Sequence, residues 1–140
     1  MNRALALACA LTVSAAAPCV HAAGDCGAAL KTKQAWLAEG DGVQVAFVAR
    51  PMPVPLGRHF TIDFAICEGG VARSASSVSV DADMPAHRHG MNYRAGVSAL
   101  GDGTYRAQGL MFHMPGTWRV IFDLGLDGRA VRVARAIEVQ

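Results

Sequence analysis

The sequence lacks the motifs of the common enzyme families. It contains no GxSxG elbow, no HExxH pair, no phosphate-binding glycine loop and no cysteine placed as a nucleophile. Basic residues form no run, and the formal net charge is only +2, which argues against a nucleic-acid partner. We therefore expect a protein that is not an enzyme and that binds no nucleic acid.

Long apolar runs are also lacking. The longest one, Ala4 to Ala17, has about 14 residues, fewer than the roughly 20 that a membrane-spanning helix needs. Asn2-Arg3 before it and the small residues from Val20 to Ala22 after it give it the form of a cleavable export signal. We predict that residues 1–22 are a signal peptide and that residues 23–140 form one periplasmic domain, which is not inserted in the membrane.

Cysteine is scarce, and only two of the four cysteines, Cys26 and Cys67, lie beyond the predicted signal. An even pair in an oxidising compartment predicts a disulfide. This bridge would close a loop of about 42 residues and contribute about 4 kcal/mol in the chain-entropy model. In the alternative interpretation both thiols bind copper, but the pair lacks CxxC spacing and lies far in sequence from the histidine-containing segments described below.

From Val43 onward the chain shows an alternation of apolar and polar residues with a period of two. Gly, Pro, Asn and Asp clusters separate the alternating runs, as is typical of antiparallel sheets. The predicted strands are Val43–Ala49, Phe60–Cys67, Ser77–Asp83, Arg94–Leu100, Thr104–Phe112, Thr117–Leu124 and Ala130–Val139. Seven short strands in about 100 residues predict an all-β fold, an immunoglobulin-like antiparallel β-sandwich.

The alternation also predicts the core and the connections. The expected inward-facing residues are Phe60, Ile62, Phe64 and Ile66, then Val78, Val80 and Ala82, and then Trp118, Val120, Phe122 and Leu124. Glycine permits the positive φ of tight turns, which predicts hairpins at Gly101-Asp102-Gly103 and Leu126-Asp127-Gly128. The prolines between residues 51 and 55 cannot donate ladder hydrogen bonds, so they belong to an edge or a connecting arm. Between Cys26 and Gly40 the sequence is compatible with a short helix and with an extra strand.

Two short segments concentrate side chains that bind soft metal ions. Residues 84–91 (MPAHRHGM) and 113–116 (HMPG) hold three of the five histidines and three of the six methionines. Imidazole nitrogen and thioether sulfur together form a ligand set that suits copper, Cu(I) above all. We therefore predict a Cu(I) site, and its candidate ligands are His87, His89, Met91, His113, Met114 and Met84.

In the first segment, three of the positions have a structural alternative. His87 and His89 are two residues apart, so extended backbone would turn both to one side, with Gly90 letting the chain turn after them. The alternative for this pair is an exposed polar loop. Met84 continues the inward register of the preceding strand and is either a ligand or a core residue, whereas Met91 lies in polar company and is the better ligand.

In the second segment, His113 and Met114 are adjacent and would face opposite sides of a straight strand, so only a bend at Pro115-Gly116 would present both. Met114 shares the register of the apolar residues before it, which leaves His113 as the better ligand. We expect the two aspartates before the first segment to lie on a solvated face of the sheet. In the alternative, one of their carboxylates orients a ligand histidine. These aspartates are Asp81 and Asp83, and the residues assigned no role in the site are His59, Met52 and Met111.

Three stretches resemble bacterial YtkA-like and FixH-like domains: PMPVPLGRHFTIDF, DADMPAHRHGMNY and GDGTYRAQGLMFHMPGTW. The resemblance covers about residues 43–124, and its matching positions are Met84, Pro85, His87, His89, Gly90 and Met91, followed by Gly109, Phe112, Met114, Gly116 and Trp118. It implies a small periplasmic or membrane-tethered β-sandwich with a role in handling copper, which for FixH-like members is delivery during cytochrome oxidase assembly. The chain departs from the FixH pattern in having a cleavable signal in place of a membrane helix, and in its cysteine pair.

Two functional hypotheses follow from the sequence. In the first, the protein is a periplasmic Cu(I) chaperone or scavenger that exchanges the ion with a copper-donating or copper-accepting periplasmic protein. In the second, it is a metal-free periplasmic interaction or ligand-binding module whose methionines form an adaptable contact surface. The first hypothesis requires the histidines and methionines to converge in the fold, and the second does not.

Overall fold

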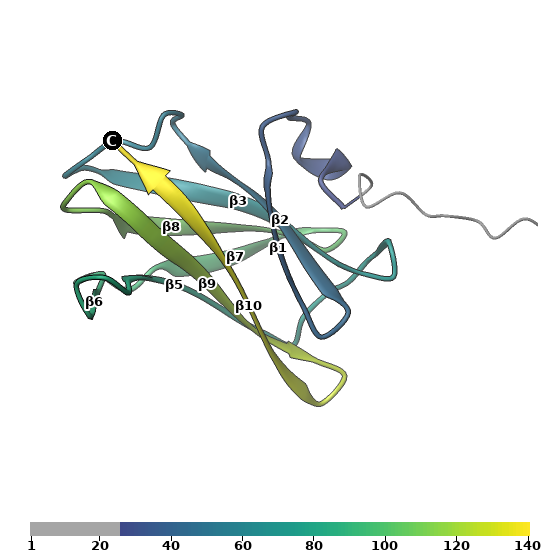
Figure 1. Ribbon diagram of the computed structural model, residues 1–140. Helices are drawn as coiled ribbons and strands as arrows, with labels where there is room; N and C mark the ends of the chain where they lie inside the picture. Colours follow the sequence, from purple (N-terminus) through teal and green to yellow (C-terminus); the bar gives the residue numbers. More distant parts are fainter. Residues whose placement is uncertain (1–25) are drawn as a thin grey trace, which may run out of the picture.

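The computed structural model describes residues 26–140, and the predicted signal peptide with its cleavage site lies outside them (Figure 1). In chain order the elements are η1 (Ala28–Leu30), β1 (Trp36–Gly40), β2 (Val43–Arg50), β3 (His59–Glu68), β4 (Val71–Ala72), β5 (Ser77–Met84), β6 (His89–Gly90), β7 (Gly96–Gly101), β8 (Thr104–Met111), β9 (Gly116–Leu126) and β10 (Arg129–Val139). All seven predicted strands are present with small shifts at their ends. The segment between Cys26 and Gly40 contains both alternatives, a short 3-10 helix followed by a strand.

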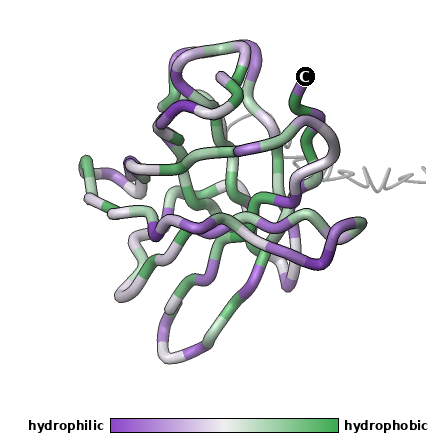
Figure 2. Tube along the Cα trace, turned by 90° about the vertical axis from the view of Figure 1, so that its left-hand side faces the viewer, coloured by the Kyte–Doolittle hydropathy of each residue, from purple (hydrophilic) through white to green (hydrophobic). Residues whose placement is uncertain are grey.

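The strands form two antiparallel sheets that enclose a shared core. One sheet has the order β1-β2-β3-β8-β7, with β4 paired to the end of β3, and the other has the order β10-β9-β5-β6. Hydrophobic and hydrophilic residues alternate along the strands (Figure 2), and the predicted inward-facing side chains of β3 and β9 are all buried. The rings of Phe64 and Phe122 meet across the sheets with their centres 5.1 Å apart. The predicted all-β sandwich is confirmed.

The two predicted hairpin turns are confirmed at one end of the sandwich. Asp102-Gly103 and Asp127-Gly128 both have two successive positive φ angles, 49° and 73° in the first and 49° and 76° in the second, which is the conformation of a type I′ turn. A third turn of this kind, Asp41-Gly42, joins β1 to β2. Strand registers and an ion pair between Arg73 and Asp127 bring the three turns to the same end. We call it the Asp-Gly end, and the opposite end, where β5 turns into β6 and β8 passes into β9, the histidine end.

The predicted disulfide is confirmed between Cys26 and Cys67, with an S–S distance of 2.06 Å and a Cα–Cα distance of 5.7 Å. Both cysteines are buried in a small apolar cluster, where Leu30 of η1 packs against the outer face of β2 and β3. The bridge therefore attaches the N-terminal segment to the sandwich. Because both sulfurs are in the bridge, the alternative in which the two thiols bind copper does not hold.

Asp63 on β3 is the one buried charged side chain in residues 26–140. Arg106 donates to it from Nε at 2.6 Å and from Nη2 at 2.9 Å, and Arg50 donates from Nε at 2.7 Å. The hydrogen bonds from Arg106 lower the pKa of the Asp63 carboxyl, burial opposes this effect, and the hydrogen bond from Arg50 adds to it. This network connects three neighbouring strands, β2, β3 and β8, on the outer face of their sheet.

We expect Asp63→Asn to lower the free energy of unfolding by about 2 kcal/mol at pH 7, because charge-assisted hydrogen bonds to a buried group are lost. The folded-state pKa is lowered, so the wild-type advantage is complete above the unfolded-state pKa of about 4 and disappears as the pH falls through the folded-state pKa. Urea unfolding of both proteins between pH 2.5 and 8 measures the difference. A stability difference that does not change below pH 4 would contradict this account of the carboxylate.

Candidate metal centre

The first predicted segment forms a tight hairpin at the histidine end. Pro85–Arg88 make the turn between β5 and β6, closed by a hydrogen bond from the His87 amide to the Met84 carbonyl at 3.0 Å. Arg88 has a φ of 54°. Our expectation that the chain turns at Gly90 was wrong, because this residue is paired with Asp83 inside β6. A Cβ at Gly90 would lie 3.2 Å from the Ala82 carbonyl oxygen, so glycine here permits close backbone approach.

His87 and His89 are neighbours, but the reason differs from the one predicted from extended backbone. His87 lies in the turn and is exposed, whereas His89 opens β6 and is half-buried. Their ring centres are 5.9 Å apart. The hairpin register, in which Met84 lies opposite His89, therefore sets the position of the second ring.

The second segment meets this hairpin directly. The chain bends at Met114-Pro115 between β8 and β9, so both His113 and Met114 turn towards β6. We expected that only a bend near Pro115 would present both side chains together. The His113 ring centre is 4.9 Å from that of His89, and the Met114 Sδ is 3.3 Å from the His89 Nε2. His89 is therefore the central residue of the group.

Trp118 packs against the group from the core side. The period-two pattern identified it only as a core residue and gave no sign of this contact. Its indole Nε1 donates to the Met114 carbonyl oxygen at 3.0 Å. Its ring is fully buried, stacks on Phe112 at 4.5 Å, and meets the rings of His113 and His89 edge-on at 5.4 Å and 5.8 Å. The tryptophan thus fixes the bend that directs the methionine sulfur at His89.

Two of the predicted ligands, Met84 and Met91, pack with the core. Met84 is 2% exposed and belongs to the core cluster, which favours its structural alternative. Met91 packs against the core and lines a separate hollow of about 350 Å³ with Asp81 and Tyr93. In the described part of the chain, neither sulfur makes a hydrogen-bond contact with a histidine ring. The structure brings together His87, His89, His113 and Met114, while Met84 pairs with His89 through the backbone and its side chain packs in the core.

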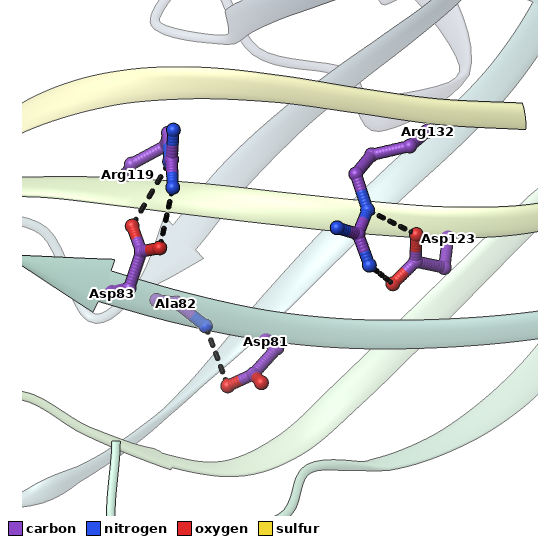
Figure 3. A network of polar contacts seen from close by, with 6 residues as sticks. All are labelled: Asp81, Ala82, Asp83, Arg119, Asp123 and Arg132. Atoms are coloured by element: carbon purple, nitrogen blue, oxygen red, sulfur yellow. Dashed lines mark hydrogen bonds and ion pairs between the residues drawn. The ribbon is translucent and has the colours of Figure 1, made fainter. Parts of the chain in front are cut away.

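The two aspartates before the hairpin lie on the solvated face of the four-stranded sheet, as expected. Arg119 donates to Asp83 from Nε at 2.9 Å and from Nη2 at 2.5 Å, and the neighbouring Arg132 makes the same kind of pair with Asp123 (Figure 3). Asp81 accepts a hydrogen bond from the Ala82 amide at 2.8 Å (Figure 3). The carboxylate of Asp83 thus binds Arg119 and does not orient a histidine.

The donor set restricts the ions that the histidine end suits. Among residues 26–140, no group of three or more His, Cys, Asp or Glu side chains is arranged to hold a metal ion. The group at the histidine end combines imidazole nitrogen with the sulfur of Met114, and thioether sulfur is a soft ligand that suits Cu(I) better than hard cations. The mixed nitrogen and sulfur group is small, partly exposed and reached from solvent through His87 and His113.

Comparison with known proteins gives a family and a fold. The model of the YtkA-like family matches residues 37–123. No curated protein matches the chain. The crystal structure of a DUF4426 family protein from Pseudomonas aeruginosa is similar in fold, with a TM-score of 0.53 and 14% sequence identity over 74% of this chain and 96% of that one. The expected FixH-like relationship stays a prediction. Within residues 26–140, no helix has both the length and the hydropathy that crossing a bilayer requires.

Proposed function

The chain belongs to the YtkA-like family, and from this premise we propose that it is an exported copper-binding protein that holds Cu(I) at the histidine end and passes it to or from a periplasmic partner. The observation that supports the proposal most directly is the 3.3 Å approach of the Met114 Sδ to the His89 Nε2. Two segments that lie 25 residues apart in sequence thus place a soft sulfur and an imidazole nitrogen side by side.

The separation of these two atoms suits a shared ion. First-row metal ions such as zinc bind imidazole nitrogen at about 2.0 Å and sulfur at about 2.3 Å, so two such ligands of one tetrahedral ion lie about 3.5 Å apart. His113 and His87 are close enough to His89 to supply a further nitrogen after a side-chain rotation, since their ring centres are 4.9 Å and 5.9 Å away. The proposed ligands are therefore Met114, His89, and one or both of the flanking histidines.

The exposure of the site supports transfer of the ion. His87 and His113 are exposed, whereas His89 and Met114 are half-buried. A partner's ligands can thus displace the outer histidines before the inner pair releases the ion. The FixH-like resemblance directs the search for an acceptor to oxidase assembly, and copper resistance is the other pathway to examine.

We expect the disulfide-intact protein, residues 23–140, to bind one Cu(I) per chain in competition with bicinchoninate under anaerobic conditions. Bound ion should also raise the melting temperature, because a ligand at about 100 times its Kd adds about 2.7 kcal/mol to the stability of the folded state. Met91→Leu is the matched control and should bind as wild type does, since that sulfur lies outside the group. Absence of competition and of a thermal shift would instead support the metal-free interaction module.

A further inference from the structure

Three arginines at the histidine end are not engaged in ion pairs within residues 26–140. They are Arg58, Arg88 and Arg94, and all three are exposed. Arg88 lies between the two hairpin histidines, and Arg58 follows Gly57, whose amide donates to the Phe112 carbonyl next to His113. Arg94 follows Tyr93, whose ring meets the His59 ring edge-on at the start of β3, with the ring centres 5.0 Å apart. The proposed site is thus bordered by uncompensated positive charge.

The carboxylates offset only part of this charge. Asp83, which lines a hollow with Arg88 and His89, is already bound by Arg119. Glu138, at the end of β10, keeps its negative charge because its partner is the neutral hydroxyl of Thr117, and Asp81 lines a hollow with Arg94, so these two carboxylates oppose the three arginines. The aspartates of the three Asp-Gly turns lie at the opposite end of the sandwich. The charge of the molecule is therefore polarised along the strands, with the histidine end positive.

Apolar side chains accompany the arginines. Met52 and Leu56 of the proline-containing arm are each 41% exposed, and Tyr93 is 46% exposed. Leu56 forms an isolated bridge with Phe112, which places the arm beside the His113 loop. A surface with a few exposed apolar side chains and arginines around a central site has the composition of a protein-binding surface.

We infer that the histidine end is a docking surface for an acidic protein, which presents carboxylates to Arg58, Arg88 and Arg94 while its own ligands reach the His89 and Met114 pair. The part of this inference that concerns the ion rests on the proposed function, whereas the docking does not. A ring of arginines repels a free aqueous cation and attracts an anionic carrier. The charge pattern therefore fits direct exchange between proteins, and it does not fit scavenging of the free ion.

The test uses two synthetic donor peptides that carry the same Met-Xaa-Xaa-Met motif loaded with Cu(I), one flanked by three glutamates and the other by three lysines. At low salt the glutamate peptide should transfer its ion to the protein about 10 times faster than the lysine peptide, and the two rates should converge near 0.5 M NaCl, where charges are screened within a few ångströms. R58E/R88E/R94E should reverse the preference. The variant K31E/K33E/R129E has the same change in net charge, with Arg129 beside the turn at the Asp-Gly end, and should keep the wild-type preference.

A second measurement needs no metal. Titration of the 15N-labelled, metal-free protein with the unloaded glutamate peptide should shift amide signals of residues 50–59, 85–94 and 111–116, and the triple glutamate variant should abolish these shifts. Shifts at other residues, or equal rates for the two peptides when Cu(I) binds normally, would overturn the docking inference and leave the metal site intact. Failure of Cu(I) binding with normal peptide shifts would instead reject only the proposed function. Stronger binding to phosphatidylglycerol vesicles than to the glutamate peptide would overturn the docking inference.

Discussion

Replacement of His89 by alanine is expected to lower the affinity for Cu(I) by about 100-fold or more and replacement of His87 by about 10-fold, which corresponds to about 2.7 and 1.4 kcal/mol of binding free energy. The difference follows from position. His89 contacts the Met114 sulfur and lies between the other two imidazole rings, so its removal leaves no nitrogen beside the sulfur. His87 is exposed in the turn, and His113 can take its place as the second nitrogen. The double variant H87A/H89A should lose binding altogether.

Competition with a Cu(I) chelator measures these affinities, and far-ultraviolet circular dichroism reports whether each variant is folded. We expect the fold to survive, because neither histidine belongs to the core cluster. His59→Ala is the matched control, since this histidine is exposed at the same end but contacts Tyr93 and not the group around His89. An equal loss of affinity in H59A, or unfolding of H89A, would show that the effect does not come from a ligand.

The strands were predictable from sequence where the period-two alternation runs long enough to be recognised. Most predicted strands present at least three inward positions to the core, whereas the strand at β7 contributes only Ala95 and Val97, both partly buried. The two-residue strands β4 and β6 have no periodicity to detect, because their pairing is imposed by the strands beside them. Strand β1 follows the disulfide-linked segment, where helix formers at residues 31–38 obscured a pattern only five residues long.

The site was predictable as two segments but not as a set of atoms. Local composition identified both clusters of histidine and methionine, but the register argument favoured Met91 as a ligand over Met84 and Met114, whereas the sulfur that contacts His89 is that of Met114. Hairpin register places Met84 and its cross-strand partner His89 on the same face of the sheet, but Met84 is buried in the core whereas His89 is half-buried and contacts the second loop. The bend before Pro115 turns the Met114 side chain out of the inward register of β8, so that its sulfur reaches His89. Both placements depend on tertiary pairing, which no short window of sequence contains.

Substitution of Trp118 should have the largest effect on stability of any change at the histidine end. The side chain is fully buried and stacked on Phe112, and truncating a buried tryptophan to alanine costs about 3–5 kcal/mol. Trp118→Phe keeps most of the apolar volume and removes the donor to the Met114 carbonyl, so we expect a loss of about 1–2 kcal/mol in the free energy of unfolding. Urea unfolding at pH 7 measures both losses.

A positioning role for Trp118 predicts more than a loss of stability. If the indole holds the bend that directs the Met114 sulfur at His89, W118F should lower Cu(I) affinity by about 10-fold in the wild-type background and have little further effect in M114L, since coupled residues give non-additive changes. Phe122→Leu, at the centre of the core, is the control that lowers stability without changing affinity. Additive effects of W118F and M114L would mean that the tryptophan acts only through general packing, and the sulfur would then owe its position to the Pro115 bend alone.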